Sequence, residues 1–227
     1  MILNRGSESI KHEIFVHLPE VIPSQALMVF NDTEVIPSKL YGFLKKNARP
    51  IEVLLIRETT DENHWEVLIK GLGKLRLGTE IEFGDGELKA IVTMLQEDKA
   101  IVKLIYKGQL NSILSRIGRM PLPPYIQRKT IEDEGLSEQD RERYQTVFAR
   151  HAGAIAAPTA GLHISKEFLE ACKQNSVEIG YLTLHIGSGT YEPIRTLEIN
   201  EHHMHQEHMD LSRDLCDRIN RVKINDG

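Results

Sequence analysis

Two kinds of hydrophobic periodicity divide the chain. From Ser38 to about Tyr106 apolar and polar residues alternate in short runs, which are separated by Gly-, Asn- and Asp-containing turns such as Gly71–Gly73 and Gly84–Gly86. A period of two is typical of half-buried β-strands. It predicts six strands, at Lys39–Leu44, Ile51–Arg57, Trp65–Lys70, Thr79–Phe83, Leu88–Leu95 and Ala100–Tyr106. Strands this close together, without helices between them, indicate a small antiparallel barrel or sandwich.

Helices and strands are expected to alternate in the rest of the chain. Short apolar runs predict strands at Ala26–Phe30, Gly153–Ala157 and Val177–Ile186. Helices are predicted from Ser137 to Arg150, after Ser165 with Phe168, Leu169 and Cys172 on one face, and after Ser212 with Leu215, Ile219 and Val222 inward. This alternation indicates a mixed or parallel sheet with helical cover. We therefore predict a mixed α/β domain, residues 1–37 and 118–227, interrupted by an inserted six-stranded antiparallel β-barrel, residues 38–117.

Composition narrows the class of protein. The 227 residues are 41% hydrophobic and 27% charged, which indicates one large or two small domains and excludes collagen-like and disordered chains. No apolar run approaches the roughly 18–20 residues of a membrane span, and the first residues lack the pattern of a secretory signal. Cys172 and Cys216 are far apart, which fits a reducing compartment. We expect a cytoplasmic monomer without membrane contact.

The net charge of −5 argues against a general polyanion binder, but the basic residues are clustered. Seven of them and no acidic residue lie between Lys99 and Ile131. A second such tract, between Glu34 and Glu52, contains Lys39, Lys45, Lys46 and Arg49. Local positive tracts in an acidic protein favour selective contact with phosphates. Solvated strand and loop faces are the simpler interpretation, and both stay open.

Polar residues follow the first predicted strand directly. Asn31, Asp32 and Thr33 come after the apolar run that ends at Phe30. Their side chains can bond a ligand as well as the backbone. An Asx or Ser/Thr turn is the commoner role for such a tripeptide.

A proline-rich segment lies inside the basic tract. Met120–Ile126 contains three prolines, which stiffen the chain and hold Tyr125 between Arg119 and Arg128. An aromatic ring beside two cations suits a stacked base next to phosphate contacts. The segment could equally be a rigid linker between domains.

Small residues connect a predicted strand with a predicted helix at Ala156–His163. In α/β sheets ligands lie beyond the carboxyl ends of the strands, where helix N-termini attract anionic groups. Gly161 would let a ligand approach the backbone, while Thr159 and His163 offer polar contacts. A tight connection without a ligand is the alternative.

The segment from Leu184 to His208 combines glycine and histidine. Gly187 and Gly189 allow unusual backbone geometry, but the third glycine of a dinucleotide fingerprint and the Gly-Lys-Ser/Thr of a phosphate loop are missing. Four histidines and a glutamate follow within seven residues, at His202, His203, His205, Glu207 and His208. Because no Glu-x-x-His or Cys-x-x-Cys pattern completes a metal site, we expect no metal and interpret these groups as candidates for proton transfer or substrate bonding.

Together these segments resemble the S-adenosylmethionine:tRNA ribosyltransferase-isomerases of queuosine biosynthesis. The motifs that carry the resemblance span nearly the whole chain. They are Phe30–Thr33 with Val35–Pro37, Met120–Ile126 with Arg128, Asp140–Val147, Ala156–His163, Leu184–Gly187 with Gly189 and Thr190, and His202-x-Met204-His205-x-Glu207. The resemblance implies an α/β domain with an inserted β-barrel, in agreement with the periodicity.

The resemblance also implies a reaction. The ribosyl part of S-adenosylmethionine is transferred to the aminomethyl-deazaguanine at the wobble position of tRNA and isomerised, which gives epoxyqueuosine and releases adenine and methionine. Such chemistry needs a base for the acidic proton next to the sulfonium, an acid that helps adenine leave, and a site that excludes water. S-adenosylmethionine is then a substrate, and no prosthetic group is expected.

The resemblance assigns candidate roles to individual residues. The candidates for substrate binding are Asn31, Asp32, Thr33, Thr159, Gly161, Gly187, Gly189 and Thr190. The candidates for catalysis are His163, His185, His203, His205 and Glu207. Contact with the tRNA anticodon stem-loop is expected from Arg119, Tyr125 and Arg128.

The chain also departs from the family pattern. Glu34 follows Asn-Asp-Thr where the family usually has Arg, and Ile164 follows His163 in place of the usual Phe. Family members have a further N-terminal segment and continue beyond the position of Gly227, so we expect this chain to lack parts of the family fold. A second hypothesis is therefore a truncated or degenerate homologue that binds tRNA or a nucleoside without turnover.

Overall fold

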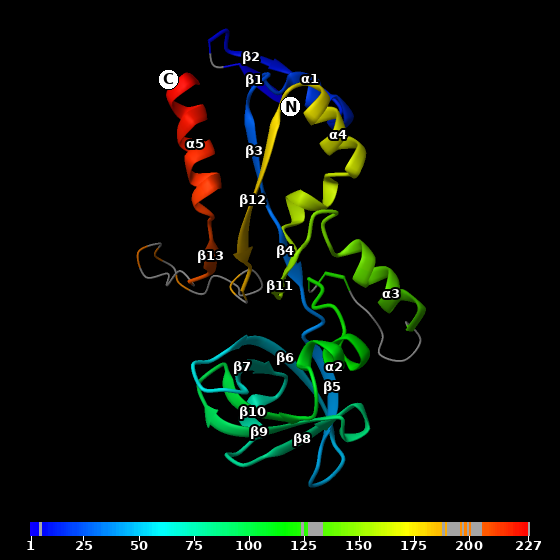
Figure 1. Ribbon diagram of the computed structural model, residues 1–227. Coiled ribbons are helices and arrows are strands. Elements are labelled where there is room, and N and C mark those ends of the chain that lie inside the picture. The colour runs from blue at the N-terminus through cyan, green and yellow to red at the C-terminus, as the bar shows by residue number, and fades with distance from the viewer. Residues whose placement is uncertain are drawn as a thin grey trace.

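A computed structural model describes residues 1–4, 6–123, 125–126, 134–187, 189, 196, 198, 200 and 206–226, with the backbone alone at 134–137, 225 and 226. The mixed α/β fold with a closed six-stranded antiparallel β-barrel is confirmed. Figure 1 shows the barrel below an α/β part that contains both chain ends. No helix in the described ranges is long and apolar enough to cross a membrane.

The barrel strands follow the sequence prediction closely. They are β5 (Lys39–Leu44), β6 (Pro50–Glu58), β7 (His64–Ile69), β8 (Glu80–Phe83), β9 (Leu88–Leu95) and β10 (Ala100–Tyr106). Antiparallel pairing closes them in the order β10-β7-β6-β5-β8-β9. Inward positions such as Leu40, Val53, Val67, Ile81 and Val102 are fully buried. The alternation of apolar residues thus becomes the barrel core, as expected for strands with one buried face.

Short helices complete the barrel. The helix α2 (Leu110–Ile117), which the sequence did not predict, packs Ile113 and Leu114 against the barrel core. Two 3-10 turns, η2 (Leu72–Lys74) and η3 (Gly84–Gly86), occupy the positions predicted as glycine turns. The helix α2 covers one end of the barrel and leads the chain back to the α/β part (Figure 1).

The chain enters and leaves the barrel at one place. Lys39 and Arg119 exchange backbone hydrogen bonds of 3.1 and 2.8 Å. A Cβ atom at Gly118 would lie 2.0 Å from the carbonyl oxygen of Pro37, so only glycine fits there. The two connections are therefore packed side by side. The domain limits at 37/38 and 117/118 stay a prediction.

The α/β part is built on two small groups of strands. β12 (Glu178–His185) pairs in parallel with β3 (Leu27–Asn31) and antiparallel with β13 (His208–Asp210). β4 (Thr33–Val35) pairs in parallel with β11 (His151–Ala154). Between β3 and β4, the Asp32 N–H donates to Leu182 O at 2.9 Å, while the Asp32 carbonyl accepts from Arg150 N at 2.8 Å. At Asp32 the chain therefore changes its partner from β12 to β11.

Helices cover these strands on both sides (Figure 1). The prediction of a helix capped by Ser165 is confirmed, because Ser165 Oγ accepts from Phe168 N at 3.2 Å at the start of α4 (Lys166–Gln174). Phe168, Leu169 and Cys172 form its buried face. On the other side, Leu215 of α5 (Arg213–Asp226) packs directly on Gly180 of β12. A Cβ atom at Gly180 would lie 2.4 Å from Cδ1 of Leu215, so a larger residue would not fit there.

The predicted helix Ser137–Arg150 is wrong in its bounds. The helix α3 spans Glu134–Arg143, so Ser137 lies inside it instead of capping it. Beyond the helix the chain continues in turns, in which Tyr144, Thr146 and Phe148 are buried. Tyr144 belongs to one core cluster and Phe148 to another. The segment thus joins two cores, which a continued helix with a single apolar stripe would not do.

Other boundaries differ from the prediction as well. The strand predicted at Gly153–Ala157 is β11, which ends at Ala154 because Ile155 N donates to Ile186 O at 3.0 Å and so leaves the β4 ladder. The Asx turn is present, because Asn31 Oδ1 accepts from Thr33 N at 3.1 Å, and Thr33 then begins strand β4. The first residues form β1 (Ile2–Asn4), β2 (Ser9–Lys11), η1 (Phe15–His17) and α1 (Leu18–Val21), none of which was predicted.

Candidate functional site

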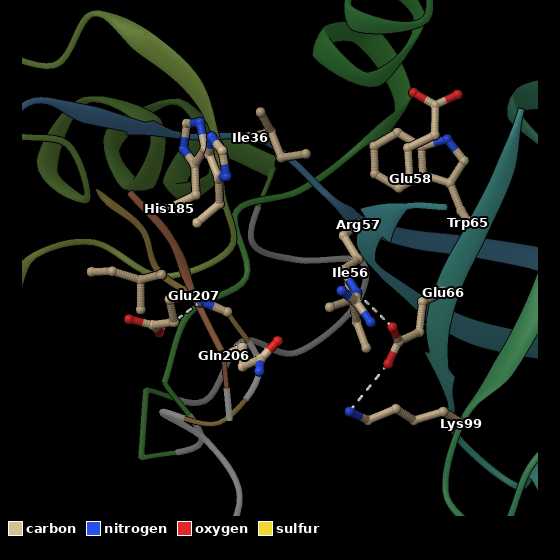
Figure 2. Close-up of a pocket in the computed structure, with 14 residues that line it drawn as sticks. Ile36, Ile56, Arg57, Glu58, Trp65, Glu66, Lys99, His185, Gln206 and Glu207 are labelled. Atoms are coloured by element: carbon tan, nitrogen blue, oxygen red, sulfur yellow. Dashed lines mark hydrogen bonds and ion pairs between the residues drawn. The ribbon is translucent and has the colours of Figure 1, made fainter. Parts of the chain in front are cut away.

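A cavity of about 490 Å³ lies between the barrel and the carboxyl end of β12. Figure 2 shows His185, Gln206 and Glu207 on one side and Arg57, Glu66 and Lys99 on the other. Ligands in α/β proteins commonly bind beyond the carboxyl ends of strands and between domains. The cavity is lined by Ile36, Ile56, Arg57, Glu58, Trp65, Glu66, Lys99, Gly153, His185, Ile186, Gly187, Gln206, Glu207 and His208.

Asn31 ties β3 to the end of β12. Its Nδ2 donates to Leu184 O at 2.9 Å, and its Oδ1 accepts from Leu184 N at 2.9 Å and from Thr33 N at 3.1 Å. The amide thus replaces the backbone pairing that is lost where the chain turns toward β4. These bonds use both polar atoms of the Asn31 side chain, and they position the strand that carries His185.

Asp32 is buried, with 4% of its surface exposed. Its Oδ1 accepts from Thr183 Oγ1 at 2.7 Å, and its Oδ2 lies 3.7 Å from His151 Nε2. These contacts fix the Asp32 carboxyl group against Thr183 of β12 and His151 of β11.

Thr33 and His185 form the central pair of the site. Thr33 is completely buried, and its Oγ1 lies 2.8 Å from His185 Nδ1. The carbonyl oxygen of His151 lies 3.5 Å from the same hydroxyl. In the tautomer with the ring proton on Nδ1, the Thr33 oxygen accepts from the ring and Nε2 keeps a lone pair.

The environment of His185 favours its neutral form. Burial, and then the nearby His208 and His151, lower the pKa of His185, while Asp32 opposes them. The rings of His185 and His208 are stacked with centroids 6.2 Å apart. Gly153 lies against the His185 ring, since a Cβ atom there would be 2.7 Å from Cε1. A neutral imidazole with one nitrogen tied down is the form that a general base needs.

Glu207 holds the loop that follows β12. Its Oε1 accepts from Gly187 N at 3.0 Å. No described atom would contact a Cβ at Gly187 within 4 Å, so the backbone there borders open space in the cavity. Glu207 and Gly187 thus lie with His185 in the lining of the cavity.

The barrel supplies the opposite wall of the cavity. Glu66 accepts from Arg57 Nε at 2.7 Å and pairs with Lys99 Nζ at 3.2 Å. Burial alone would raise the pKa of Glu66, but the two cations hold it below the ordinary value. Nε1 of Trp65 is buried and makes no hydrogen bond within the described ranges. A ligand with an acceptor near this indole would satisfy it.

The predicted residues of the Ala156–His163 segment lie elsewhere. They form η4 (Thr159–His163), in which Thr159 and His163 are exposed, and they are not among the residues that line the cavity. The ring of His163 is 6.2 Å from that of Phe15. A Cβ atom at Gly161 would lie 3.0 Å from Thr146 Cγ2, so close packing against the protein accounts for this glycine.

The predicted tRNA contacts are also separate from the cavity. Arg119 lies over the ring of Tyr41, with its guanidinium carbon 5.5 Å from the centroid, and Tyr125 is 79% exposed. Gly189 does not line the cavity. Four further predicted residues fall outside the described part of the chain, namely Arg128, Thr190, His203 and His205.

Several residues of the site were not identified from the sequence. Thr183 precedes His185 by two residues and therefore lies on the same face of β12. The period of two along the strand could have identified Thr183 from the sequence. His208, which the sequence had indicated only as part of the histidine cluster, pairs with His185 across β12 and β13. The barrel residues Arg57, Trp65, Glu66 and Lys99 carry no motif, and only the tertiary structure brings them to the cavity. Within the described ranges, no group of three or more His, Cys, Asp or Glu residues could hold a metal ion.

Fold and cavity together define an α/β protein with an inserted β-barrel and a polar cleft between the two parts. The family of queuosine biosynthesis proteins matches residues 1–227, so the chain belongs to this family. Among solved structures, the chain is similar to S-adenosylmethionine tRNA ribosyltransferase from Thermotoga maritima, with 20% sequence identity and a TM-score of 0.34. That match covers 99% of this chain and 57% of the other, so the chain spans little more than half of that enzyme's length.

Proposed function

We propose that the chain is an S-adenosylmethionine-dependent tRNA ribosyltransferase-isomerase. It transfers the ribosyl part of S-adenosylmethionine to the aminomethyl-deazaguanine wobble base of tRNA and isomerises it to epoxyqueuosine, with release of adenine and methionine. The proposal is supported by membership of the queuosine biosynthesis family. Because the chain spans only 57% of the Thermotoga maritima enzyme, turnover by this length of chain is itself part of the proposal.

The observation that carries the proposal is the pairing of His185 with Thr33 at a cavity between barrel and sheet. A proton next to the sulfonium of S-adenosylmethionine is acidic because the positive sulfur stabilises the carbanion. The neutral ring of His185, held by Thr33 at Nδ1, can take that proton on Nε2. His185 is thus the proposed general base.

The other predicted groups receive roles that agree with their contacts. Asn31 and Asp32 position strand β12 and the histidines beside it, and Glu207 holds the backbone at Gly187 for the substrate. His203, His205 and His163 remain candidates for the acid that protonates adenine, and Thr159, Gly161, Gly189 and Thr190 remain candidates for substrate contacts. The two walls of the cavity would exclude water from the carbanion.

The partners follow from the reaction. S-adenosylmethionine is a substrate, and tRNA is the acceptor, with Arg119, Tyr125 and Arg128 as candidate contacts to the anticodon stem-loop. A cytoplasmic location and a monomeric state agree with a tRNA substrate and stay predictions.

The decisive experiment separates turnover from binding. The chain is incubated with S-adenosylmethionine and tRNA that carries the aminomethyl-deazaguanine, and released adenine and the modified nucleoside are quantified by mass spectrometry. We expect both products in equal amounts, and neither with tRNA that has guanine at the wobble position. Adenine without modified tRNA would indicate hydrolysis at an incomplete site. Binding of tRNA without either product would contradict the proposal and favour the alternative of a binding module.

A further inference from the structure

Two cavities adjoin on the outside of the barrel, away from the candidate active site. They have volumes of about 770 and 800 Å³ and share Arg49 in the turn between β5 and β6. In Figure 1 this hairpin extends from the barrel on the side away from β12. The residues lining the two cavities include seven basic side chains, which we call the barrel basic face: Lys45, Lys46, Arg49, Lys70, Lys74, Arg76 and Arg119.

The positive charge of this face is largely uncompensated. The cavities contain two acidic side chains, and both are already paired, Glu80 with Lys45 at 2.5 Å and Glu52 with Lys39 at 3.0 Å. Five exposed cations form no ion pair with any residue of the described ranges: Lys46, Arg49, Lys70, Lys74 and Arg76. In a chain with a net charge of −5, such a concentration needs an anionic partner or a large shell of counterions.

An aromatic stripe crosses the same face. On β5, Leu40, Gly42 and Leu44 point into the barrel, so Tyr41 and Phe43 lie on its outer surface. The ring of Tyr41 is covered by cations, with Lys39 Nζ and Arg119 Cζ 5.6 and 5.5 Å from its centroid. Phe43 is 56% exposed. It is therefore available for a planar group from outside.

We propose that the barrel basic face binds the phosphate backbone of an RNA and that Phe43 stacks with an unpaired base of the same RNA. Cations without protein partners gain free energy by releasing the counterions of a polyanion. Aromatic rings on an open sheet surface stack with bases of any sequence. An acidic peptide would also pair with these cations, but it would not explain the exposed aromatic ring of Phe43 among them.

The identity of this RNA rests on the proposed function, which makes it tRNA. The face and the candidate active site lie on different sides of the barrel, so one elongated molecule has to contact both. The face would then hold the tRNA outside the cavity, which raises affinity and leaves the chemistry to the cavity. Its Arg119 is also one of the predicted contacts to the anticodon stem-loop.

The test measures binding of an unmodified tRNA transcript at several KCl concentrations, without S-adenosylmethionine. The variant Lys74→Gln/Arg76→Gln should reduce the slope of log affinity against log salt by about 1.4 to 1.8, since each of the two phosphate contacts contributes roughly 0.7 to 0.9. The matched control is Lys103→Gln/Lys107→Gln, which removes the same charge on and just after β10, three strands away from β5 in the closed barrel. It should leave the slope unchanged.

Phe43→Ala tests stacking separately from charge. It should weaken binding by about tenfold without a change of slope, and Phe43→Trp should keep wild-type affinity. An unchanged slope in Lys74→Gln/Arg76→Gln, or an equal loss in the β10 control, would overturn the proposal. Equal affinity for poly-glutamate would overturn the assignment to RNA. If these variants bind as expected but the wild-type chain releases no adenine in the turnover assay, only the proposed reaction fails. If the chain releases adenine but the variants bind RNA as tightly as the wild type, only the role of the barrel basic face is contradicted.

Discussion

Thr33 Oγ1 lies 2.8 Å from Nδ1 of His185, although 152 positions separate the two residues. The contact joins the start of β4 to the end of β12, next to the place where the chain changes its strand partner. It also holds the His185 ring by its Nδ1 atom. We expect the activity of the protein to depend on it.

Thr33→Val removes the hydroxyl while it keeps the shape and the β-branch. His185 then loses its Nδ1 partner, and we expect the kcat of adenine release to fall about tenfold or more. The free energy of unfolding should decrease by about 1–2 kcal/mol, because a buried hydrogen bond is lost. Thr33→Ser, which keeps the hydroxyl, should retain most of the activity. Steady-state kinetics and urea unfolding measure the two effects, and a fully active Thr33→Val variant would remove Thr33 from the mechanism.

The pH dependence of the reaction should report the neutral form of His185. Burial and the neighbouring His208 and His151 lower its pKa below the ordinary value of 6.5. A general base acts in its deprotonated form. With a lowered pKa, His185 stays deprotonated as the pH falls through 6.5, and it loses activity only when the pH reaches its own lower pKa. The acidic limb of kcat/KM should therefore have its midpoint below 6.5, measured as adenine release between pH 4.5 and 8.

His208→Gln provides a check on that assignment. It removes a positive charge that disfavours the protonated form of His185, so the midpoint of the acidic limb should move upward. A shift in the opposite direction, or none, would show that another group controls this limb.

The barrel could be predicted from the sequence because its signal is local. Each strand alternates apolar and polar residues between glycine turns, and β5, β9 and β10 have the predicted bounds. The cap at Ser165 is local as well. The end of helix α3 could not be predicted in this way. Tyr144 and Phe148, which follow the helix, belong to different cores that only the tertiary structure brings together.

The candidate site could be predicted only where its residues belong to local sequence motifs. Motifs identified Asn31, Thr33, His185 and Glu207, but no motif marks the barrel residues Glu66 and Lys99 that face them. The cavity arises because the barrel is placed against the end of β12, and one sequence carries no local signal for this placement. Thr159 and His163, which a family motif had suggested, do not line the cavity.

Gly153 should be indispensable because the His185 ring occupies the space of a side chain. Gly153→Ala would bring a Cβ atom within 2.7 Å of Cε1 and displace the ring from Thr33. We expect a loss of activity of at least tenfold and a decrease of about 1–3 kcal/mol in the free energy of unfolding. Gly73→Ala is the matched control, since nothing in the described part of the chain lies within 4 Å of a Cβ atom there. Equal behaviour of the two variants in activity assays and urea unfolding would contradict this role.

Gln145 should stabilise the fold without taking part in the chemistry. Its Oε1 accepts from Val35 N at 3.0 Å and its Nε2 donates to Val35 O at 2.7 Å, so one side chain satisfies both polar groups of a buried residue. Gln145→Leu leaves these two backbone groups unpaired, and we expect a loss of about 2–4 kcal/mol in the free energy of unfolding. Gln145→Glu keeps the acceptor and loses the donor, so its stability should lie between those of the wild type and the leucine variant. Urea denaturation orders the three proteins, and a leucine variant as stable as the wild type would show that water replaces the amide at no cost.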